Sequence, residues 1–259
     1  MAAPNALMAA CLAGALGIAS PAQGQTGARR PAPRRLGEPR VTLSISGGAQ
    51  APADRVADQI TFERNVETET IDVKYPNTPG VLVDVGVSVR VWKQLGIGVD
   101  VAHVAGDGTA DVTASVPHPF FFTQPRTVTG TQGGIAREET GIHVQLQYLI
   151  QPSPRIRVVV GGGPSRIQLT QDIVTDVNVN EAYPYDTAEF RDAAIKQATA
   201  SVNGFNAGVD VTWKLTRNVG FGGFVRYTRA NADLDVRTGH TLTMKAGGAQ
   251  GAAGVRFAF

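Results

Sequence analysis

Cysteine is almost absent from this sequence of 259 residues, which contains a single one, Cys11. It lies in an apolar stretch over residues 7–18 that is followed by small residues, although no lysine or arginine precedes the stretch. This pattern predicts a secretory signal peptide over residues 1–25, with cleavage after Ala22 or Gly24. The exported chain would then contain no cysteine, which excludes a fold held by disulfide bonds.

Long hydrophobic runs and a strong net charge are missing as well. After the predicted signal, no apolar run reaches the roughly 18 residues that a membrane-spanning helix needs. The formal net charge of +2 is too small to indicate a nucleic acid as partner. Arginine and proline are concentrated in residues 26–39, which we predict to be an extended, solvated linker.

Glycine, by contrast, is abundant: there are 30 residues, many of them inside segments that otherwise resemble β-strands. The clearest such segment covers residues 201–229. Folded about Arg217, it predicts an antiparallel hairpin with one apolar face and one polar, glycine-rich face, closed by a turn at residues 216–218. The predicted pairs are Leu215–Val219, Trp213–Phe221, Val211–Gly223, Val209–Val225, Ala207–Tyr227, Lys214–Gly220, Thr212–Gly222, Asp210–Phe224 and Gly208–Arg226.

The same alternation recurs along the chain and predicts eight strands in total. The hairpin over residues 80–105 is expected to fold about Lys93, with Val91 opposite Leu95. In the strand that begins at Ile156, the apolar phase shifts at Gly161–Pro164, which we interpret as a β-bulge. The strands are expected at residues 40–50, 80–91, 95–105, 138–150, 156–169, 201–215, 219–229 and 246–259.

The connections between these strands alternate in length. Within the first long connection, residues 60–66 and 70–75 alternate well enough to extend the flanking strands. The third contains the capping-box sequence Asp186-Thr-Ala-Glu189, which predicts a short helix from Ala188 to Ala198. Tight turns at residues 92–94, 151–155 and 216–218 share one end with both termini, and the long connections over residues 51–79, 106–137, 170–200 and 230–245 lie at the other.

A transmembrane β-barrel typically has an even number of strands, with tight turns at one end and long connections at the other. The polar face is then expected to point inward, because the lumen of eight strands is crowded and accepts glycine. Asp210 and Arg226 are expected to pair there. The predicted polar network of the lumen consists of Asp84, Arg90, Asp100, His143, Gln145, Gln147, Asp210, Arg226 and Arg256. The aromatic residues predicted at the membrane interface are Trp92, Trp213, Phe221 and Tyr148.

In strand number, loop asymmetry and the terminal segment Val255-Arg256-Phe257-Ala258-Phe259, residues 40–259 resemble the small OmpA/OmpX-type outer-membrane barrels. The resemblance implies an all-β, eight-stranded antiparallel up-and-down barrel in the outer membrane of a Gram-negative cell envelope, surrounded by its lipids. Residues 26–39 would then be a periplasmic linker. It also implies that the barrel-assembly machinery recognises the terminal strand through Val255, Phe257 and Phe259.

Motifs for catalysis or metal binding are missing. The lipid A deacylase barrels, which an enzyme of this architecture would resemble, carry a histidine and a serine two residues apart on one strand. Here His103 is followed at that spacing by Ala105, and His143 by Gln145. The acidic residues of the long connections lack the spacing of a calcium loop. We therefore expect no catalytic residue, no metal and no cofactor.

Three functions remain open. A plugged polar lumen favours a monomeric barrel with a structural or surface-interaction role, which would meet an extracellular ligand through its long connections. The second is a narrow channel for small solutes, and the third is a membrane-embedded lipid-modifying enzyme. Pro117–Phe122 is an apolar tip between prolines, and it is expected either to form an exposed contact surface or to fold over the barrel mouth as a lid.

Overall fold

The computed structural model describes residues 39–237 and 240–259, so the predicted signal peptide and residues 26–38 of the predicted linker lie outside the described residues. All regular structure in the described residues is antiparallel β-strand. The strands are β1 (Val41–Pro52), β2 (Ala57–Arg64), β3 (Glu67–Lys74), β4 (Gly80–Trp92), β5 (Leu95–Val116), β6 (Arg126–Ile150), β7 (Ile156–Glu181), β8 (Ala188–Lys214), β9 (Val219–Arg237) and β10 (His240–Ala258).

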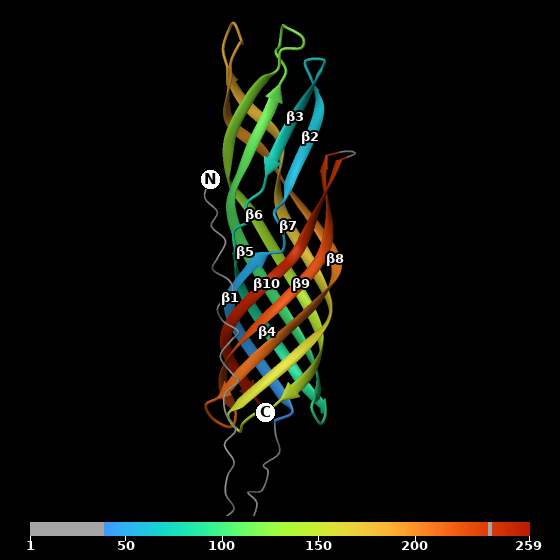
Figure 1. The fold of residues 1–259 in the computed structure, drawn as a ribbon, viewed down its shortest axis with the longest axis vertical. Coiled ribbons are helices and arrows are strands. Elements are labelled where there is room, and N and C mark those ends of the chain that lie inside the picture. The colour runs from blue at the N-terminus through green and yellow to red at the C-terminus, as the bar shows by residue number, and fades with distance from the viewer. Residues whose placement is uncertain (1–38, 238–239) are drawn as a thin grey trace, which may run out of the picture. The chain divides into compact units, whose positions relative to one another are not determined.

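Eight of these strands close into a barrel (Figure 1). Each strand from β4 to β10 pairs with its neighbour in the chain, and β1 closes the ring by pairing with both β4 and β10. The closing ladder runs from Thr42–Ala258 to Pro52–Gly248. The predicted eight-stranded up-and-down barrel is therefore confirmed. The C-terminus lies at the end of the barrel that carries the tight turns.

The predicted register of the hairpin over residues 201–229 is also confirmed. β8 and β9 oppose Trp213 to Phe221 and Gly208 to Arg226, and the other predicted pairs agree with the same register. In such a hairpin the turn fixes which residues face each other, so local sequence is sufficient to predict it.

The hairpin of β4 and β5 agrees except at its turn. Val89 lies opposite Ile97 and Gly86 opposite Asp100, as folding about Lys93 requires. The register then shifts, so that Trp92 instead of Val91 faces Leu95. The last predicted pair is wrong because the strand becomes irregular before the turn.

The strands continue well beyond their predicted ends. β5 to β8 contain between 22 and 27 residues each, and most of each long connection is strand. β2 and β3 form an extra hairpin that joins β5 through pairs from Thr70–Ser115 to Lys74–Asp111. We call the part beyond the closed ring the extension; it consists of β2, β3 and residues 106–137, 170–203, 230–237 and 240–246.

The predicted helix from Ala188 to Ala198 is wrong. This segment belongs to β8 and pairs with β7 from Gln171 to Glu181. The capping-box sequence is a local signal, whereas strand pairing with β7 supplies hydrogen bonds along the whole segment and packs Phe190 and Ala193 against the apolar interior. Tertiary pairing therefore overrides the local preference.

The predicted bulge at Gly161–Pro164 is wrong too. β7 keeps one register with β8 from Ile156–Trp213 through Leu169–Ala200, and it also keeps one register with β6 on both sides of Pro164. What changes along β7 is the face that carries the apolar side chains: Val160 points outward, whereas Ile167 and Leu169 point inward. The shift of phase in the sequence records a change of surroundings, not an extra residue.

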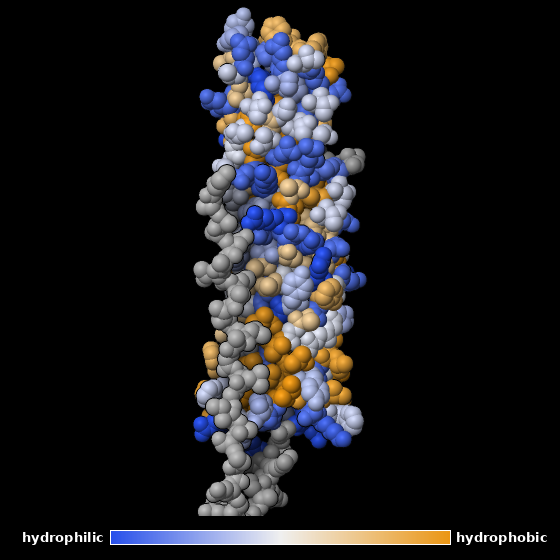
Figure 2. Space-filling model, viewed as in Figure 1, coloured by the Kyte–Doolittle hydropathy of each residue, from blue (hydrophilic) through white to orange (hydrophobic). Residues whose placement is uncertain are grey.

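This inversion divides the barrel into two halves. In the tight-turn half, the outward side chains of β4 are apolar, and Val81, Val83, Val85, Val87 and Val89 are 42–69% exposed. We call this outward-facing zone the apolar belt. In the extension the apolar side chains form a buried core instead, which includes Ile71, Val112, Ile135, Ile173 and Leu234. Figure 2 shows hydrophobic residues gathered on the tight-turn half and hydrophilic residues prevalent along the extension.

The strands of the extension form three groups around this core. Pairing of β6 with β7 ends at Arg137–Gln171, and pairing of β8 with β9 ends at Gly204–Ala230. The groups are therefore β2-β3-β5-β6, β7-β8 and β9-β10. None of the described residues forms a helix that is long and apolar enough to cross a membrane.

Candidate functional site

The nine residues predicted to line the lumen all lie on the inward face of their strands, where they are buried or half-buried. Glycine makes room for them. A Cβ atom at Gly86 would lie 1.9 Å from Oδ1 of Asp100, and one at Gly98 would lie 2.1 Å from Nε2 of Gln147. Long polar side chains thus fold over glycine positions, which explains the glycine content of the inward face.

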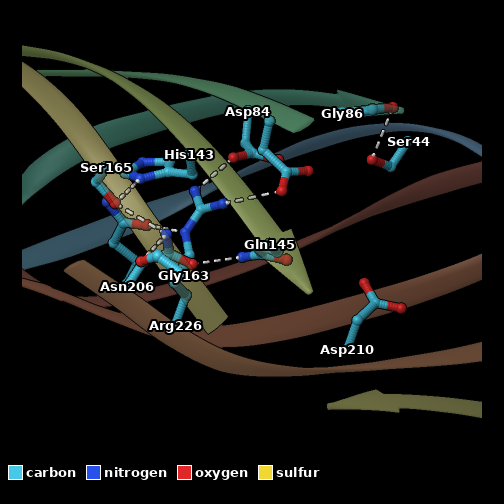
Figure 3. Close-up of polar contacts among 12 residues, drawn as sticks. Ser44, Asp84, Gly86, His143, Gln145, Gly163, Ser165, Asn206, Asp210 and Arg226 are labelled. Carbon is cyan, nitrogen blue, oxygen red and sulfur yellow. Dashed lines mark hydrogen bonds and ion pairs between the residues drawn. The ribbon is translucent and has the colours of Figure 1, made fainter. Parts of the chain in front are cut away.

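Arg226 is the centre of the network (Figure 3). Its Nη2 lies 2.5 Å from Asp84 and its Nη1 lies 3.7 Å from Asp100. Its Nε–H donates to the Gln250 side chain over 2.6 Å, and its guanidinium lies 4.8 Å from the centre of the Phe224 ring. The cation is 3% exposed and has partners on all sides, as a buried charge requires.

The expected pair of Asp210 and Arg226 is wrong. Asp210 accepts a hydrogen bond from Arg256 over 2.6 Å, and Figure 3 shows it apart from Arg226. Asp210 is only the diagonal neighbour of Arg226 within the β8–β9 hairpin. In a barrel of eight strands, side chains also meet across the lumen, and β4 supplies Asp84 from that direction.

The network continues toward the extension through residues that sequence reasoning missed. Gln250 donates to Gln50 over 2.6 Å, Gln50 donates to Glu139 over 2.9 Å, and Glu139 pairs with Arg137 over 2.6 Å. Gln50 and Gln250 are opposed in the β1–β10 ladder. Their position in the sequence could have indicated them, because both residues lie where the inward-facing residues of their strands change from polar to apolar.

A histidine–serine contact occurs between two neighbouring strands, and not within one strand. His143 on β6 faces Ser165 on β7, with 2.8 Å between Nδ1 and Oγ, and Asn206 donates to the same Oγ over 2.9 Å. His143 is 1% exposed and Ser165 4% exposed, and Nε2 of His143 has no hydrogen-bond partner among the described residues. A serine nucleophile needs an oriented base and access for a substrate. This pair has neither, so it is part of the packed interior.

The free space in the lumen is small. One cavity of about 70 Å³ lies on the tight-turn side of Arg226, among Ser44, Arg157 and Asp210. Two further cavities, of about 20 Å³ and 10 Å³, lie beside Glu139. Volumes of this size hold a few water molecules. Beyond them the core of the extension fills the interior.

The predicted interface aromatics are exposed on the outside at the tight-turn end. Trp213 and Phe221 are opposed on β8 and β9, and the hydroxyl of Tyr148 donates to Gln94 over 2.6 Å. Trp92 carries the Lys93 ammonium 4.8 Å from its ring centre. An aromatic ring with one polar neighbour suits the boundary between lipid and water.

The terminal strand closes the barrel. Val255 and Phe257 face outward on β10, between them Arg256 points inward, and Phe259 is exposed. The Phe259 N–H donates to the Val41 carbonyl over 2.9 Å, and its own carbonyl accepts from Arg40 over 2.8 Å. The residues predicted to be an assembly signal thus lie on the seam where the first and last strands meet.

The far end of the extension carries an exposed aromatic tip. Phe120, Phe121 and Phe122 are 53–67% exposed. They lie on the turn between β5 and β6 and point into solvent, so the alternative of a lid over the barrel mouth is wrong. The neighbouring turn between β7 and β8 adds Tyr183 and Tyr185, whose rings are 6.2 Å apart.

Electrostatics in the extension follow from burial and pairing. Burial raises the pKa of Tyr75, whose oxygen accepts a hydrogen bond from the Val174 N–H over 3.1 Å. A hydrogen bond from Lys245 lowers the pKa of Asp54, which links the chain after β1 to β10. No group of three or more potential metal-binding side chains occurs in the described ranges.

Comparison with known proteins finds no matching family model and no matching curated protein. Among solved structures, the chain is similar to the outer membrane protein OprG from Pseudomonas aeruginosa, with 10% identity and a TM-score of 0.49 over 86% of this chain and 98% of that one. It is similar to Neisserial surface protein A, with 12% identity and a TM-score of 0.44 over 85% and 96%. It is also similar to the outer membrane protease OmpT from Escherichia coli, with 10% identity and a TM-score of 0.43 over 85% and 97%. Sequence identities and TM-scores this low do not assign the chain to a family or a function.

Proposed function

We propose that this chain is an integral outer-membrane protein whose barrel holds a β-structured extension on the cell surface, in a structural or surface-contact role. The observation that carries the proposal is the apolar belt. Side chains such as Val85 and Val99 cover the outside of the tight-turn half while charged residues fill its interior. In water this arrangement would expose apolar surface and bury charge, whereas in a bilayer it satisfies both.

The orientation follows from the asymmetry of the ends. Tight turns and the terminal strand face the periplasm, where the barrel-assembly machinery acts on the chain, and the extension faces outward. A polar exterior and an apolar core suit the extension to water. The ring closes on itself, so the tight-turn half has no strand edge that needs a partner, and we expect a monomer surrounded by outer-membrane lipids.

The near-absence of cysteine gives a direct test of this orientation. Tyr183→Cys places a thiol on the extension, and Arg217→Cys places one in the tight turn between β8 and β9; both parent residues are exposed. A membrane-impermeant maleimide added to intact cells should label the first variant and not the second, which should react only after lysis. Labelling of Arg217→Cys alone would show that the barrel has the opposite orientation in the membrane. Labelling of neither variant on intact cells would show that the extension is not on the cell surface.

The filled lumen favours this role over a narrow channel. Side-chain contacts run across the interior from Asp84 through Arg226, Gln250 and Gln50 to Glu139. The protein reconstituted in planar bilayers should therefore show no lasting conductance steps, because the remaining cavities hold only a few waters. Steps that persist in the folded preparation and vanish after heat denaturation would establish the channel instead.

A further inference from the structure

The apolar residues at the far end of the extension form a distinct feature, which we call the crown. It consists of Val66 at the β2–β3 turn, Phe120, Phe121 and Phe122 at the β5–β6 turn, and Tyr183 at the β7–β8 turn. Each side chain is 53–84% exposed. Figure 2 shows hydrophobic atoms at this end of the extension, separated from the apolar belt by a zone rich in hydrophilic residues. The crown is therefore a second apolar zone, and not a continuation of the first.

The three turns of the crown are tied to one another. The Thr123 N–H donates to Glu67 over 2.7 Å, which joins the β5–β6 turn to the β2–β3 turn. Arg126 joins it to the β7–β8 turn, because it donates to the Pro117 and Tyr185 carbonyls over 3.0 Å each and pairs with Glu181 over 2.5 Å. These contacts hold together three turns that come from two of the strand groups, β2-β3-β5-β6 and β7-β8.

The phenylalanines are also held individually. Nδ1 of the buried His118 accepts hydrogen bonds from the N–H groups of Phe120 and Phe121, each over 3.1 Å. The Phe120 ring meets the Tyr185 ring at 5.4 Å in an edge-on arrangement. The backbone is thus fixed while the rings project into water. Such preorganisation lowers the entropic cost of a contact, whereas an exposed apolar patch without a partner only costs stability and solubility.

The arrangement of the crown residues favours a lipid surface as the partner. Its side chains project from separate turns, and none of them lines any of the three cavities described above. Short aromatic projections of this kind can enter the interfacial region of a bilayer, where aromatic side chains are favoured.

The charge around the crown decides which bilayer fits. Residues 63–69, 117–126 and 181–192, which make up the three turns, contain seven acidic residues and three arginines, a net charge of −4. All three arginines are engaged in ion pairs with carboxylates of these segments: Arg126 with Glu181, Arg64 with Glu69 and Arg191 with Asp192. An acidic rim repels anionic lipid headgroups.

We propose that the crown is a docking surface for a second, electrically neutral lipid bilayer, which the phenylalanines enter at headgroup depth. The inference deepens the proposed function, on which it rests for the position of the crown outside the cell. The barrel is anchored in one membrane through its belt and contacts another through its crown, with the polar zone of the extension as the spacer between them.

The test uses the full folded chain in lipid nanodiscs and sedimentable phosphatidylcholine vesicles as the target. The wild-type protein should sediment with these vesicles, and replacing half of the target lipid with phosphatidylglycerol should weaken binding. The triple variant Phe120→Ser, Phe121→Ser, Phe122→Ser should lose at least about tenfold in binding. Ile195→Ser is the matched control, since it removes an exposed apolar side chain from the wall of β8 and should bind as the wild type does.

A second variant keeps the test independent of folding defects. Phe121→Trp retains an aromatic ring, and brominated acyl chains placed only in the target vesicles should quench its added fluorescence. Absence of quenching, equal binding by the triple variant, or a preference for anionic vesicles would each overturn the docking surface; a protein partner would then remain for the crown. Because nanodiscs expose both faces, this outcome does not depend on orientation in the cell, which the maleimide labelling reports separately.

Discussion

Replacing Arg226 by methionine should destabilise the folded barrel by about 3–5 kcal/mol, the cost of removing one partner from a buried ion pair. The change leaves the carboxylate of Asp84, which is 2% exposed, without its partner at 2.5 Å, and it removes the donor to Gln250. The measurement is urea unfolding of the protein in phosphatidylcholine vesicles, followed by tryptophan fluorescence and by the heat-dependent shift on a gel.

Two comparisons make this result specific. Arg229→Met removes an exposed arginine three positions along β9, and it should change stability by no more than about 0.5 kcal/mol. The double variant Asp84→Asn, Arg226→Met should recover part of the loss, because a neutral amide replaces the stranded charge. If the losses of Asp84→Asn and Arg226→Met simply add, the two residues are not energetic partners across the lumen.

Val99→Arg should destabilise the protein in a bilayer by about 2–4 kcal/mol, the cost of an arginine at the centre of the lipid-facing side of a barrel. Val99 faces outward from β5, opposite Val87 on β4 and Val144 on β6. All three belong to the outward apolar face. A guanidinium at this position would have to reach the headgroups or draw water into the hydrocarbon.

Thr113→Arg is the matched control for this change. Thr113 lies on the same strand and also faces outward, but it belongs to the extension, where its neighbours on the outer face are polar. We expect a change within about 0.5 kcal/mol there. An equal loss of stability at the two positions would mean that lipid does not surround the apolar belt. It would contradict the proposed location in a membrane.

Local sequence was sufficient for the hairpins of the tight-turn half. An alternation of period two says which residues share a face, and a short turn then says which residues oppose each other. This is why folding about Arg217 predicted the β8–β9 ladder and folding about Lys93 predicted most of the β4–β5 ladder. The inward position of the charged residues followed from the same alternation, once glycine indicated the crowded side.

The same reasoning failed where the surroundings change along a strand. An outward valine in the belt and an inward leucine in the extension occupy opposite faces of one continuous strand, and a sequence records this only as a break in phase. The interruption at Gly161–Pro164 therefore looked like a bulge, and the long connections looked like loops. The capping-box sequence that begins at Asp186 favours a helix locally, but pairing with β7 makes the segment a strand.

The sequence by itself determined that this chain forms an eight-stranded barrel with a polar interior, because periodicity and turn length are local properties. Only the tertiary structure decided which charges meet. Arg226 pairs with Asp84, 142 residues away, and His143 meets Ser165 on the next strand. It also decided that the far turns join into one crown, through contacts of Arg126 and Glu67. The contact of Arg226 with Asp84 depends on ring closure, which brings side chains together across the lumen. The others depend on the pairing and packing of strands whose facing residues lie far apart in the sequence.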